Sequence, residues 1–341
     1  MPYPLHIGAA LDGVEDPFDL ASYAGAARLA EEAALDFVAL DDSLTGADRP
    51  DALLTLAAVA PLTGRIGLVP TVTTTHTEPF HVAKAVASLD HASLGRAGWR
   101  VEVSRTEADA RAVGRRGTAP DAALWAEAEA VADVASRLWD SWQDDAEIRD
   151  TATGRFVDRE RLHYVDFEGP GWSVRGPSIT PRPPQGHPLV VVRADGEPSL
   201  RAAATTADVV LVAPATLGGA RASRARVREA VAEAGRDPER VPVLADVNVF
   251  LDPDRPGPSR ALSGLTHTGS PGALAETLLE WGRVVDGFTV RPSSAAADLP
   301  VFAERVLPLL RASGAFRGEY AEDTLRARFG LPRPANRYAP A

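Results

Sequence analysis

Short apolar runs rich in β-branched residues alternate along this chain with longer, alanine-rich stretches. The short runs predict strands at 5–11, 37–40, 66–71, 98–103, 189–192, 209–213, 243–250 and 287–290. The longer stretches have the i, i+3, i+4 apolar spacing of one-sided helices and predict helices at 20–34, 51–62, 79–88, 121–142, 198–206, 218–234, 271–282 and 299–313. Alternating strands and helices imply a parallel sheet. Eight such units therefore predict an α/β fold: a closed (β/α)8 barrel of the TIM type, in one domain of residues 1–341.

An open, doubly wound sheet is the alternative architecture. Such sheets usually contain fewer strands, and their dinucleotide-binding versions carry a G-x-G-x-x-G turn after the first strand. No such turn follows residues 5–11 in this chain. The closed barrel is therefore the favoured prediction.

Two segments lie outside the alternation of strands and helices. Residues 143–187, between the fourth predicted helix and the fifth predicted strand, are polar and rich in Gly and Pro. A connection of this length in a compact domain is usually functional or extended. We expect this arm to pack over the barrel mouth, with a short hairpin around "YVDFEGPGWSVRG". The C-terminal tail, residues 315–341, lacks strand character, and we expect it to wrap the outside of the barrel.

The composition disfavours several classes of function. The chain has no cysteine, which excludes disulfides and thiolate metal sites, and its histidines lack zinc-site spacing, so we predict no metal. The net charge of −11 disfavours nucleic acid, which is bound largely by basic side chains. No apolar run approaches the roughly 20 residues that span a bilayer, and no secretory signal pattern is present. We therefore expect a cytoplasmic protein that binds neither nucleic acid nor membrane.

One predicted strand carries two charged residues. In "GWRVEV", Arg100 and Glu102 are two positions apart, so they share one face of the strand. If that face is the barrel interior, both charges must be paired, because an unpaired buried charge is strongly destabilising. The acids available to Arg100 are Glu102, Asp41 and Asp42.

Several longer stretches carry a resemblance to a known family. They are "FVALDDSL", "TVTTTHTEPFHVAKAVASLDH", "GRAGW", "LWDSWQDDA", "HYVDFEGPGWSVRGPSITPRPPQGHP", "DGFTV" and "LRARFGLPRPANRY". Taken in order, they resemble the bacterial luciferase-like flavin monooxygenases, nearest the nitrilotriacetate and dibenzothiophene-sulfone monooxygenase branch. The resemblance runs from about Leu5 to Arg337. It implies a TIM-type barrel, usually a homodimer or homotetramer, that oxidises a small molecule with O2 and with reduced FMN from a separate flavin reductase.

The resemblance also implies where the flavin ring would bind. Asp42 matches a flavin-contacting acid of the family, although an acid at this position can instead cap a turn or helix. Thr73, Thr74 and Thr75 match a Ser/Thr cluster that lines the ring. Hydroxyl groups there can donate or accept hydrogen bonds, but threonines are also common at strand ends.

Further candidates come from loops around the barrel mouth. Arg193 and the backbone at Gly196 precede a predicted helix and could together bind the cofactor phosphate, because helix N-termini attract anions. His6 on the first strand, His76 after the third strand and Trp125 on the fourth helix are candidates for the substrate pocket. No catalytic residue is assigned.

Several positions depart from the family pattern. The family reads "GWN" where this chain reads "GWR", so Arg100 replaces a flavin-contacting asparagine, and Glu102 follows at a usually apolar position. The other departures lie where the family has His, Arg, Tyr, Ser and Tyr, and they are Asp121, Leu124, Trp125, Gly196 and His76. Together they remove most side-chain donors for a phosphate, and Asp121 adds a repulsive charge.

Two hypotheses of different classes follow. The first is a two-component monooxygenase that binds reduced FMN. The second is a barrel with a degenerate flavin site that acts as a binding or assembly protein, or as a cofactor-independent enzyme. An ion pair of Arg100 filling the place of the ring would favour the second hypothesis. A third hypothesis replaces FMN by a deazaflavin.

Overall fold

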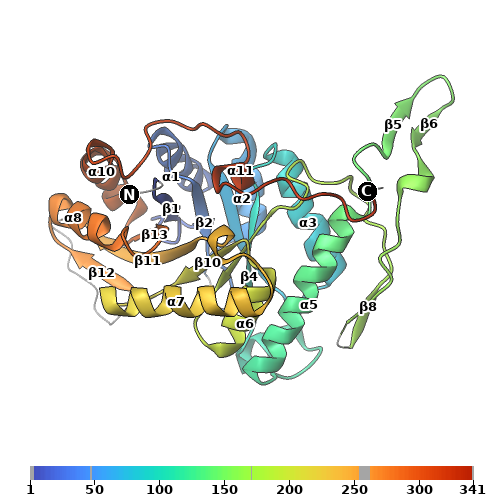
Figure 1. Cartoon of the computed structure of the whole chain (residues 1–341), viewed down its shortest axis with the longest axis horizontal. Helices are drawn as coiled ribbons and strands as arrows, with labels where there is room; N and C mark the ends of the chain where they lie inside the picture. Colours follow the sequence, from blue (N-terminus) through green and yellow to red (C-terminus); the bar gives the residue numbers. More distant parts are fainter. Residues whose placement is uncertain (1–3, 47, 170, 253–261, 340–341) are drawn as a thin grey trace.

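The computed structural model describes residues 4–46, 48–169, 171–252 and 262–339. Eight parallel strands form a ring: β1 (His6–Ala10), β2 (Phe37–Leu40), β3 (Gly67–Thr73), β4 (Gly98–Glu102), β9 (Leu189–Arg193), β10 (Val209–Val212), β11 (Val243–Phe250) and β13 (Gly287–Pro292). Strand β1 pairs with β2 and β13, and β10 pairs with both β9 and β11, so the ring is closed. The predicted (β/α)8 barrel is confirmed (Figure 1).

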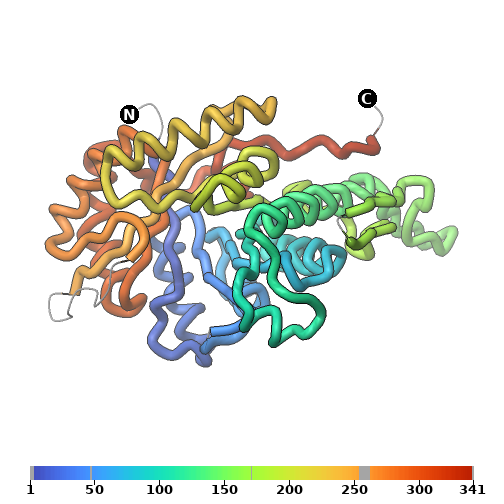
Figure 2. Tube along the Cα trace, turned by 90° about the horizontal axis from the view of Figure 1, so that it is seen from below, coloured from blue at the N-terminus to red at the C-terminus, as the bar shows by residue number. Residues whose placement is uncertain are grey.

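Helices cover the outside of the barrel (Figures 1 and 2). The main ones are α1 (Leu20–Glu32), α2 (Ala52–Val59), α3 (Pro79–Ala92), α5 (Asp121–Asp140), α6 (Glu197–Thr206), α7 (Leu217–Glu233) and α8 (Pro271–Trp281). Several begin at a side chain that accepts from a first-turn amide, as Asp19 does from Ala21 and Asp51 does from Leu54. No described helix is long and apolar enough to cross a membrane.

The last predicted helix and two short elements differ from expectation. In place of one helix at 299–313, the chain forms α9 (Ala295–Val301), a π-helical turn (Phe302–Val306) and α10 (Leu307–Ala312). The start moves earlier because Ser294 caps α9 by accepting from the Ala297 amide. Helix α4 (Glu107–Val113) and strand β12 (Leu265–Thr268), which pairs with β11, were not predicted.

Alternate residues of each strand face the barrel interior. Near the amino ends of the strands this interior is apolar. It forms one buried cluster with side chains of the C-terminal tail, made up of Phe37, Ala39, Val69, Leu189, Val191, Val209, Leu211, Leu244, Leu325, Phe329 and Leu331. The other strand faces, such as those of Ile7, Val38 and Trp99, pack beneath the helices in a larger cluster. The tail therefore fills the floor of the barrel.

The C-terminal tail is held across this floor by specific contacts (Figure 1). Its short helix α11 (Leu325–Arg328) buries Leu325 completely. The ring of Phe329 stacks on His6, with 4.3 Å between the centroids. Arg328 donates to the backbone carbonyls of Asp36 and Arg65. The tail wraps the barrel as predicted, and it also closes one end.

The arm of residues 143–187 does not lie over the mouth, contrary to expectation. It runs beside α5 and against the tail because buried polar contacts fix its two ends. Arg182 pairs with Asp140 at 2.9 Å, and Asn336 of the tail donates to the carbonyls of Asp140 and Trp142. Its predicted hairpin is present as β7 (Phe167–Gly169) and β8 (Trp172–Val174). A second hairpin, β5 (Glu147–Asp150) and β6 (Arg155–Val157), projects away from the barrel (Figures 1 and 2).

Candidate functional site

The carboxyl ends of the strands meet at the barrel mouth, which is where TIM barrels hold their active sites. Strand β4 turns Arg100 into the interior, because its neighbours Trp99 and Val101 lie in the cluster beneath the helices. Arg100 is only 6% exposed. The charged face of this strand is therefore the inner face, and its charges need partners.

Asp41, at the end of β2, joins two arginines. Arg100 donates to its Oδ1, and Arg291 at the end of β13 donates to its Oδ2 at 2.7 Å. Burial favours a higher pKa for Asp41, but Arg100 and Arg291 outweigh burial and hold its pKa well below the usual range. Arg291 also contacts Asp12 at 3.1 Å, and Arg49 donates to Asp12 at 2.7 Å.

Two further groups extend this arrangement around the mouth. On one side Arg193 of β9 donates to Asp246 of β11. On the other side Glu102 lies 3.7 Å from Arg100 and 3.0 Å from Arg105. Arg105 also donates to Asp121, at the start of α5, at 2.6 Å. We call the whole set the mouth network: Asp12, Asp41, Arg49, Arg100, Glu102, Arg105, Asp121, Arg193, Asp246 and Arg291.

The mouth network balances its charges. It contains five arginines and five carboxylates, and each of them has at least one partner of opposite sign within 4.0 Å. Removing one partner of a buried pair typically costs about 3–5 kcal/mol, because it leaves a charge uncompensated. The network is therefore self-contained, and displacing any of its members would be costly.

Asp42 lies beside the network but does not join it. Its carboxylate accepts from the Ser43 amide at 2.8 Å and from the Ala52 amide at 2.7 Å, at the start of α2. Burial raises its pKa. Both oxygens thus serve the turn before α2, which is the capping alternative considered above, and the neighbouring Asp41 is the acid that enters the mouth.

The three threonines after β3 tie two loops together. Thr73 pairs in register with Glu102 of β4. The Thr74 hydroxyl donates to the Glu102 carbonyl at 3.2 Å, and the Thr75 hydroxyl accepts from the Ser104 amide at 2.9 Å. Thr74 and Thr75 therefore hold the loop after β3 against the loop after β4, at the edge of the mouth.

The two residues expected to bind a phosphate have other partners. Arg193 is turned inward to Asp246. The amide of Gly196 donates to the Ser199 hydroxyl at 3.0 Å, and the Asp195 amide donates to the same oxygen at 2.9 Å. Burial raises the pKa of the Asp195 carboxyl close by. These donors are engaged within the chain and leave no ready anion site.

The structure separates the three residues expected in a substrate pocket. His6 begins β1, so it lies at the floor against Phe329 and Asp36, at the end of the barrel opposite the mouth. His76 follows β3, and burial together with Arg116 lowers its pKa. Trp125 is buried on α5, with the Arg105 guanidinium 5.6 Å from its ring centroid. Only His76 and Trp125 remain near the mouth.

Sequence reasoning missed three members of the mouth network: Asp12, Asp246 and Arg291. The signal for Asp246 was available, because an acid within "VLADVNVF" is as anomalous in a buried strand as Arg100 is in "GWRVEV". Asp246 is 2% exposed. Asp12 and Arg291 come from the ends of β1 and β13, which adjoin in the ring, so only the closed barrel brings them together.

FMN would need room for three fused rings and donors for a doubly charged phosphate. At this mouth, Arg100 and Arg291 reach Asp41 and Arg193 reaches Asp246, so the arginines that could meet a phosphate are already neutralised. Asp121 occupies the start of α5, where the helix N-terminus would otherwise attract an anion. The residues present do not fit FMN in the way that the resemblance implies.

Comparison with known proteins identifies what the chain is similar to. The family model described as "Luciferase-like monooxygenase" matches residues 4–263. Nitrilotriacetate monooxygenase component A of Aminobacter aminovorans is 32% identical, over 94% of this chain and 92% of that protein. Among solved structures, a long-chain alkane monooxygenase superposes with a TM-score of 0.88 at 19% identity, covering 97% of this chain and 96% of its own; this likeness concerns the fold.

Two further relatives are components of one enzyme, the pristinamycin IIA synthase of Streptomyces pristinaespiralis. The first of them is 32% identical, over 97% of this chain and 96% of the relative. The second is 28% identical, over 83% of this chain and 79% of its own length. The alignment with the first synthase component spans 333 positions, close to the chain length of 341. The alignment with the nitrilotriacetate monooxygenase component spans 416, so that relative has insertions that this chain lacks.

Proposed function

Because this chain belongs to the luciferase-like monooxygenase family, we propose that it serves a flavin monooxygenase as a subunit that does not itself bind the flavin. A relative with the same fold would carry FMN, which supplies the oxygen chemistry. The observation that carries the proposal is the mouth network. Arg100, Asp41 and Arg291 occupy the interior end of the barrel where a flavin ring would have to enter.

The relatives support this division of labour. Both pristinamycin IIA synthase components are similar to this chain, so one enzyme can contain two related chains. The chain aligns with the first of these components along almost its entire length. In such an assembly, a barrel without flavin can hold the flavin-bearing chain in place, exclude water from it, or bind part of a small organic substrate.

The second candidate is the activity that the family implies directly. In it the chain binds reduced FMN from a separate flavin reductase and oxidises a small molecule with O2. It is favoured by 32% identity along 94% of the chain to a relative whose name describes a component of a monooxygenase. This candidate requires Arg100 to leave Asp41 and the mouth network to open.

A flavin titration separates the two candidates. The purified chain should be colourless, and FMN in its oxidised and reduced forms should bind more weakly than about 1 mM. The matched variant Arg100→Asn restores the family residue, and Asp237→Asn in an exposed pair is the control. A flavin-bearing relative from the same organism, co-expressed with the chain, should co-purify with it and gain oxygenase activity.

The opposite result would be equally clear. Stoichiometric FMN binding by the isolated chain, with substrate oxidation that requires the chain, a reductase and O2, would overturn the first candidate and establish the second. Co-purification without a gain in activity would limit the role of the chain to assembly.

A further inference from the structure

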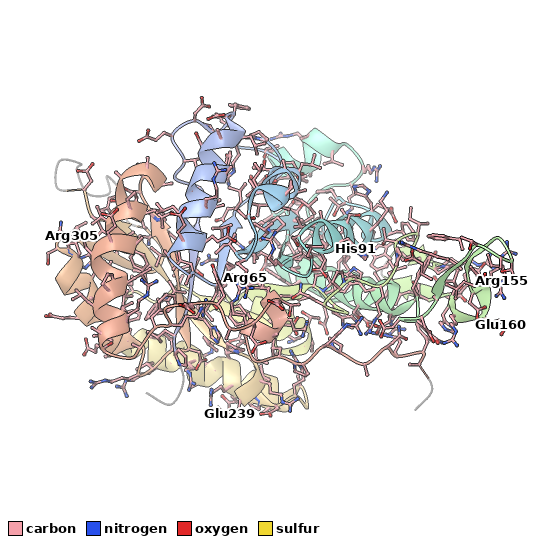
Figure 3. The ribbon with its side chains drawn as sticks, turned by 90° about the horizontal axis from the view of Figure 1, so that it is seen from above. Arg65, His91, Arg155, Glu160, Glu239 and Arg305 are labelled. Atoms are coloured by element: carbon pink, nitrogen blue, oxygen red, sulfur yellow. The ribbon has the colours of Figure 1, made fainter. Side chains whose placement is uncertain are left out.

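The β5–β6 hairpin is an exposed projection that its own chain does not cover. Its strands pair through Glu147 with Val157 and Asp150 with Arg155. Arg155 lies at the far end of the arm, away from the barrel (Figure 3). Phe156 is 56% exposed, and the Arg149 guanidinium lies 5.9 Å from its ring centroid. A two-stranded hairpin is marginally stable in water on its own, so further burial of Phe156 would stabilise it.

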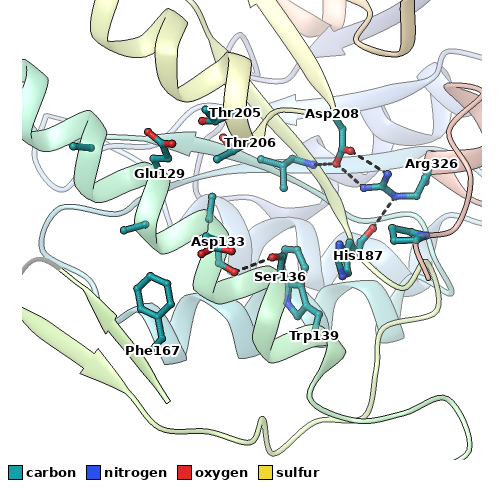
Figure 4. Close-up of a pocket in the computed structure, with 15 residues that line it drawn as sticks. Glu129, Asp133, Ser136, Trp139, Phe167, His187, Thr205, Thr206, Asp208 and Arg326 are labelled. Carbon is teal, nitrogen blue, oxygen red and sulfur yellow. Dashed lines mark hydrogen bonds and ion pairs between the residues drawn. The ribbon is translucent and has the colours of Figure 1, made fainter. Parts of the chain in front are cut away.

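A groove on the opposite side of the arm has complementary properties. It has a volume of 570 Å³ and lies between α5 and α6, with β7 and the tail at its rim. Ala126, Ala130, Trp139 and Phe167 give it apolar lining. Figure 4 shows Glu129 and Asp133 projecting from α5 along this lining, with Thr205 and Thr206 across from them. The groove thus combines an apolar floor with an acidic edge.

The unpaired charges of the two surfaces are opposite in sign. Within the described part of the chain, Glu129 has no cationic partner, whereas Asp133 is paired with Arg137 at 2.8 Å. On the hairpin side, Arg149 and Arg155 pair with acids of the arm, but Arg159 has no such partner among the described residues. Arg159 directly follows β6, close to Phe156. One free cation and one exposed ring therefore face one free carboxylate and one apolar groove.

From this complementarity we propose that the β5–β6 hairpin of one copy of the chain docks in the α5–α6 groove of a second copy. Phe156 enters the apolar part of the groove, and Arg159 pairs with Glu129. Each copy carries both a hairpin and a groove, so the exchange is reciprocal and satisfies the two-fold symmetry of a closed dimer. The inference concerns self-association and does not depend on the proposed function.

The sequence of the arm argues against other occupants. Residues 143–161 hold six acids and four arginines, interleaved, so the segment offers no basic surface for nucleic acid or for an anionic membrane. The groove carries Glu129, Asp133 and Asp208, which would repel an acidic ligand. A second copy supplies both the arginine and the aromatic ring that these surfaces lack.

Cross-linking can test the contact directly, because the chain contains no cysteine. Ala152→Cys places one thiol at the hairpin tip, and Ala130→Cys places one in the groove. The two variants are mixed and treated with a short bifunctional thiol cross-linker. We expect cross-linked dimer in the Ala152→Cys and Ala130→Cys mixture at least 10-fold faster than in a control mixture of Ala152→Cys with Glu229→Cys on α7.

Charge reversal gives an independent readout of the same contact. Arg159→Glu and Glu129→Arg should each weaken dimerisation at least 10-fold, as measured by light scattering during gel filtration. The double variant should recover most of the loss, since it restores opposite charges. Circular dichroism must show unchanged folding in every variant. A monomer at all concentrations, a dimer insensitive to both reversals, or equal cross-linking to Glu229→Cys would overturn the proposal.

Discussion

Arg100 on β4 reaches past the intervening strand β3 to pair with Asp41 at the end of β2. Asp41 in turn accepts from Arg291 on the other side of the ring. One carboxylate thereby joins strands that are not neighbours in the barrel. The stability of the mouth depends on it more than on either arginine alone.

Replacing Asp41 should be the most damaging change in the mouth network. Asp41→Asn leaves two buried arginines without their shared acceptor, and we expect a loss of about 3–5 kcal/mol in the free energy of unfolding. Arg100→Met should cost less, because Asp41 keeps Arg291. In a double-mutant cycle measured by urea unfolding, the two changes should be coupled by about 1–3 kcal/mol.

The control for this cycle is an ion pair at the surface. Asp237 and Arg240 are 56% and 69% exposed, so Asp237→Asn should change the free energy of unfolding by less than about 1 kcal/mol. Additive effects of Asp41→Asn and Arg100→Met would contradict the paired geometry.

A buried carboxyl outside the mouth should make stability depend on pH. Asp90 in α3 is fully buried, and it accepts from the Ala97 amide at 3.1 Å and from the Gln185 side chain at 2.6 Å. Burial raises its pKa to about 6. An acid whose pKa is raised by folding stabilises the protein at low pH, and this contribution is lost as pH rises from about 4 through about 6.

The Asp90→Asn variant should remove this dependence. Between about pH 4 and pH 7 the wild-type protein should lose on the order of 3 kcal/mol more than the variant does. The measurement is the free energy of unfolding at each pH, and the readout is the difference in slope, since the amide changes the absolute stability as well. Parallel pH profiles for the two proteins would show that Asp90 does not titrate in this range.

The tail should contribute strongly to stability through Phe329. This ring is 5% exposed and stacks on His6 at the barrel floor. Phe329→Ala opens a cavity there and should cost about 3–5 kcal/mol in chemical unfolding. The matched control is Phe18→Ala, because Phe18 is 72% exposed and its loss should cost less than about 0.5 kcal/mol. Equal effects would mean that the floor does not need the tail.

The hydroxyl of Thr75 should matter more than its methyl group. It accepts from the Ser104 amide, and both residues are buried. Thr75→Ala leaves that amide without an acceptor and should cost about 1–3 kcal/mol. Thr75→Ser keeps the hydroxyl and should recover most of the stability, as measured by thermal unfolding. A serine variant as unstable as the alanine variant would assign the effect to packing instead.

The barrel could be predicted from the sequence because its signal repeats. Each of the eight strands is a short apolar run, and every one of them appears in the structure. The short helix α4 and the strand β12 lack that signal, since neither contains a long apolar period. The arm was misplaced because its position depends on Arg182 and Asn336, which meet the end of α5 only after the chain has folded.

The site shows the same limit at the level of single residues. The pairing of Arg100 with Asp41 was among the predicted alternatives, because the period of the strand fixes which way Arg100 points. Asp42 differs from Asp41 by one position and therefore turns away, to the start of α2. His6 could have been assigned to the floor from its place at the beginning of β1, whereas the capture of Arg193 by Asp246 requires the closed ring.

The plug formed by Leu325, Phe329 and Leu331 has a consequence for biosynthesis. The last stretch of the chain to leave the ribosome is the one that seals the interior of the barrel. While translation continues, the apolar ends of the strands stay open to water and to other nascent chains. A message truncated shortly before residue 325 would yield nearly complete barrels with an open floor, which chaperones and proteases would recognise.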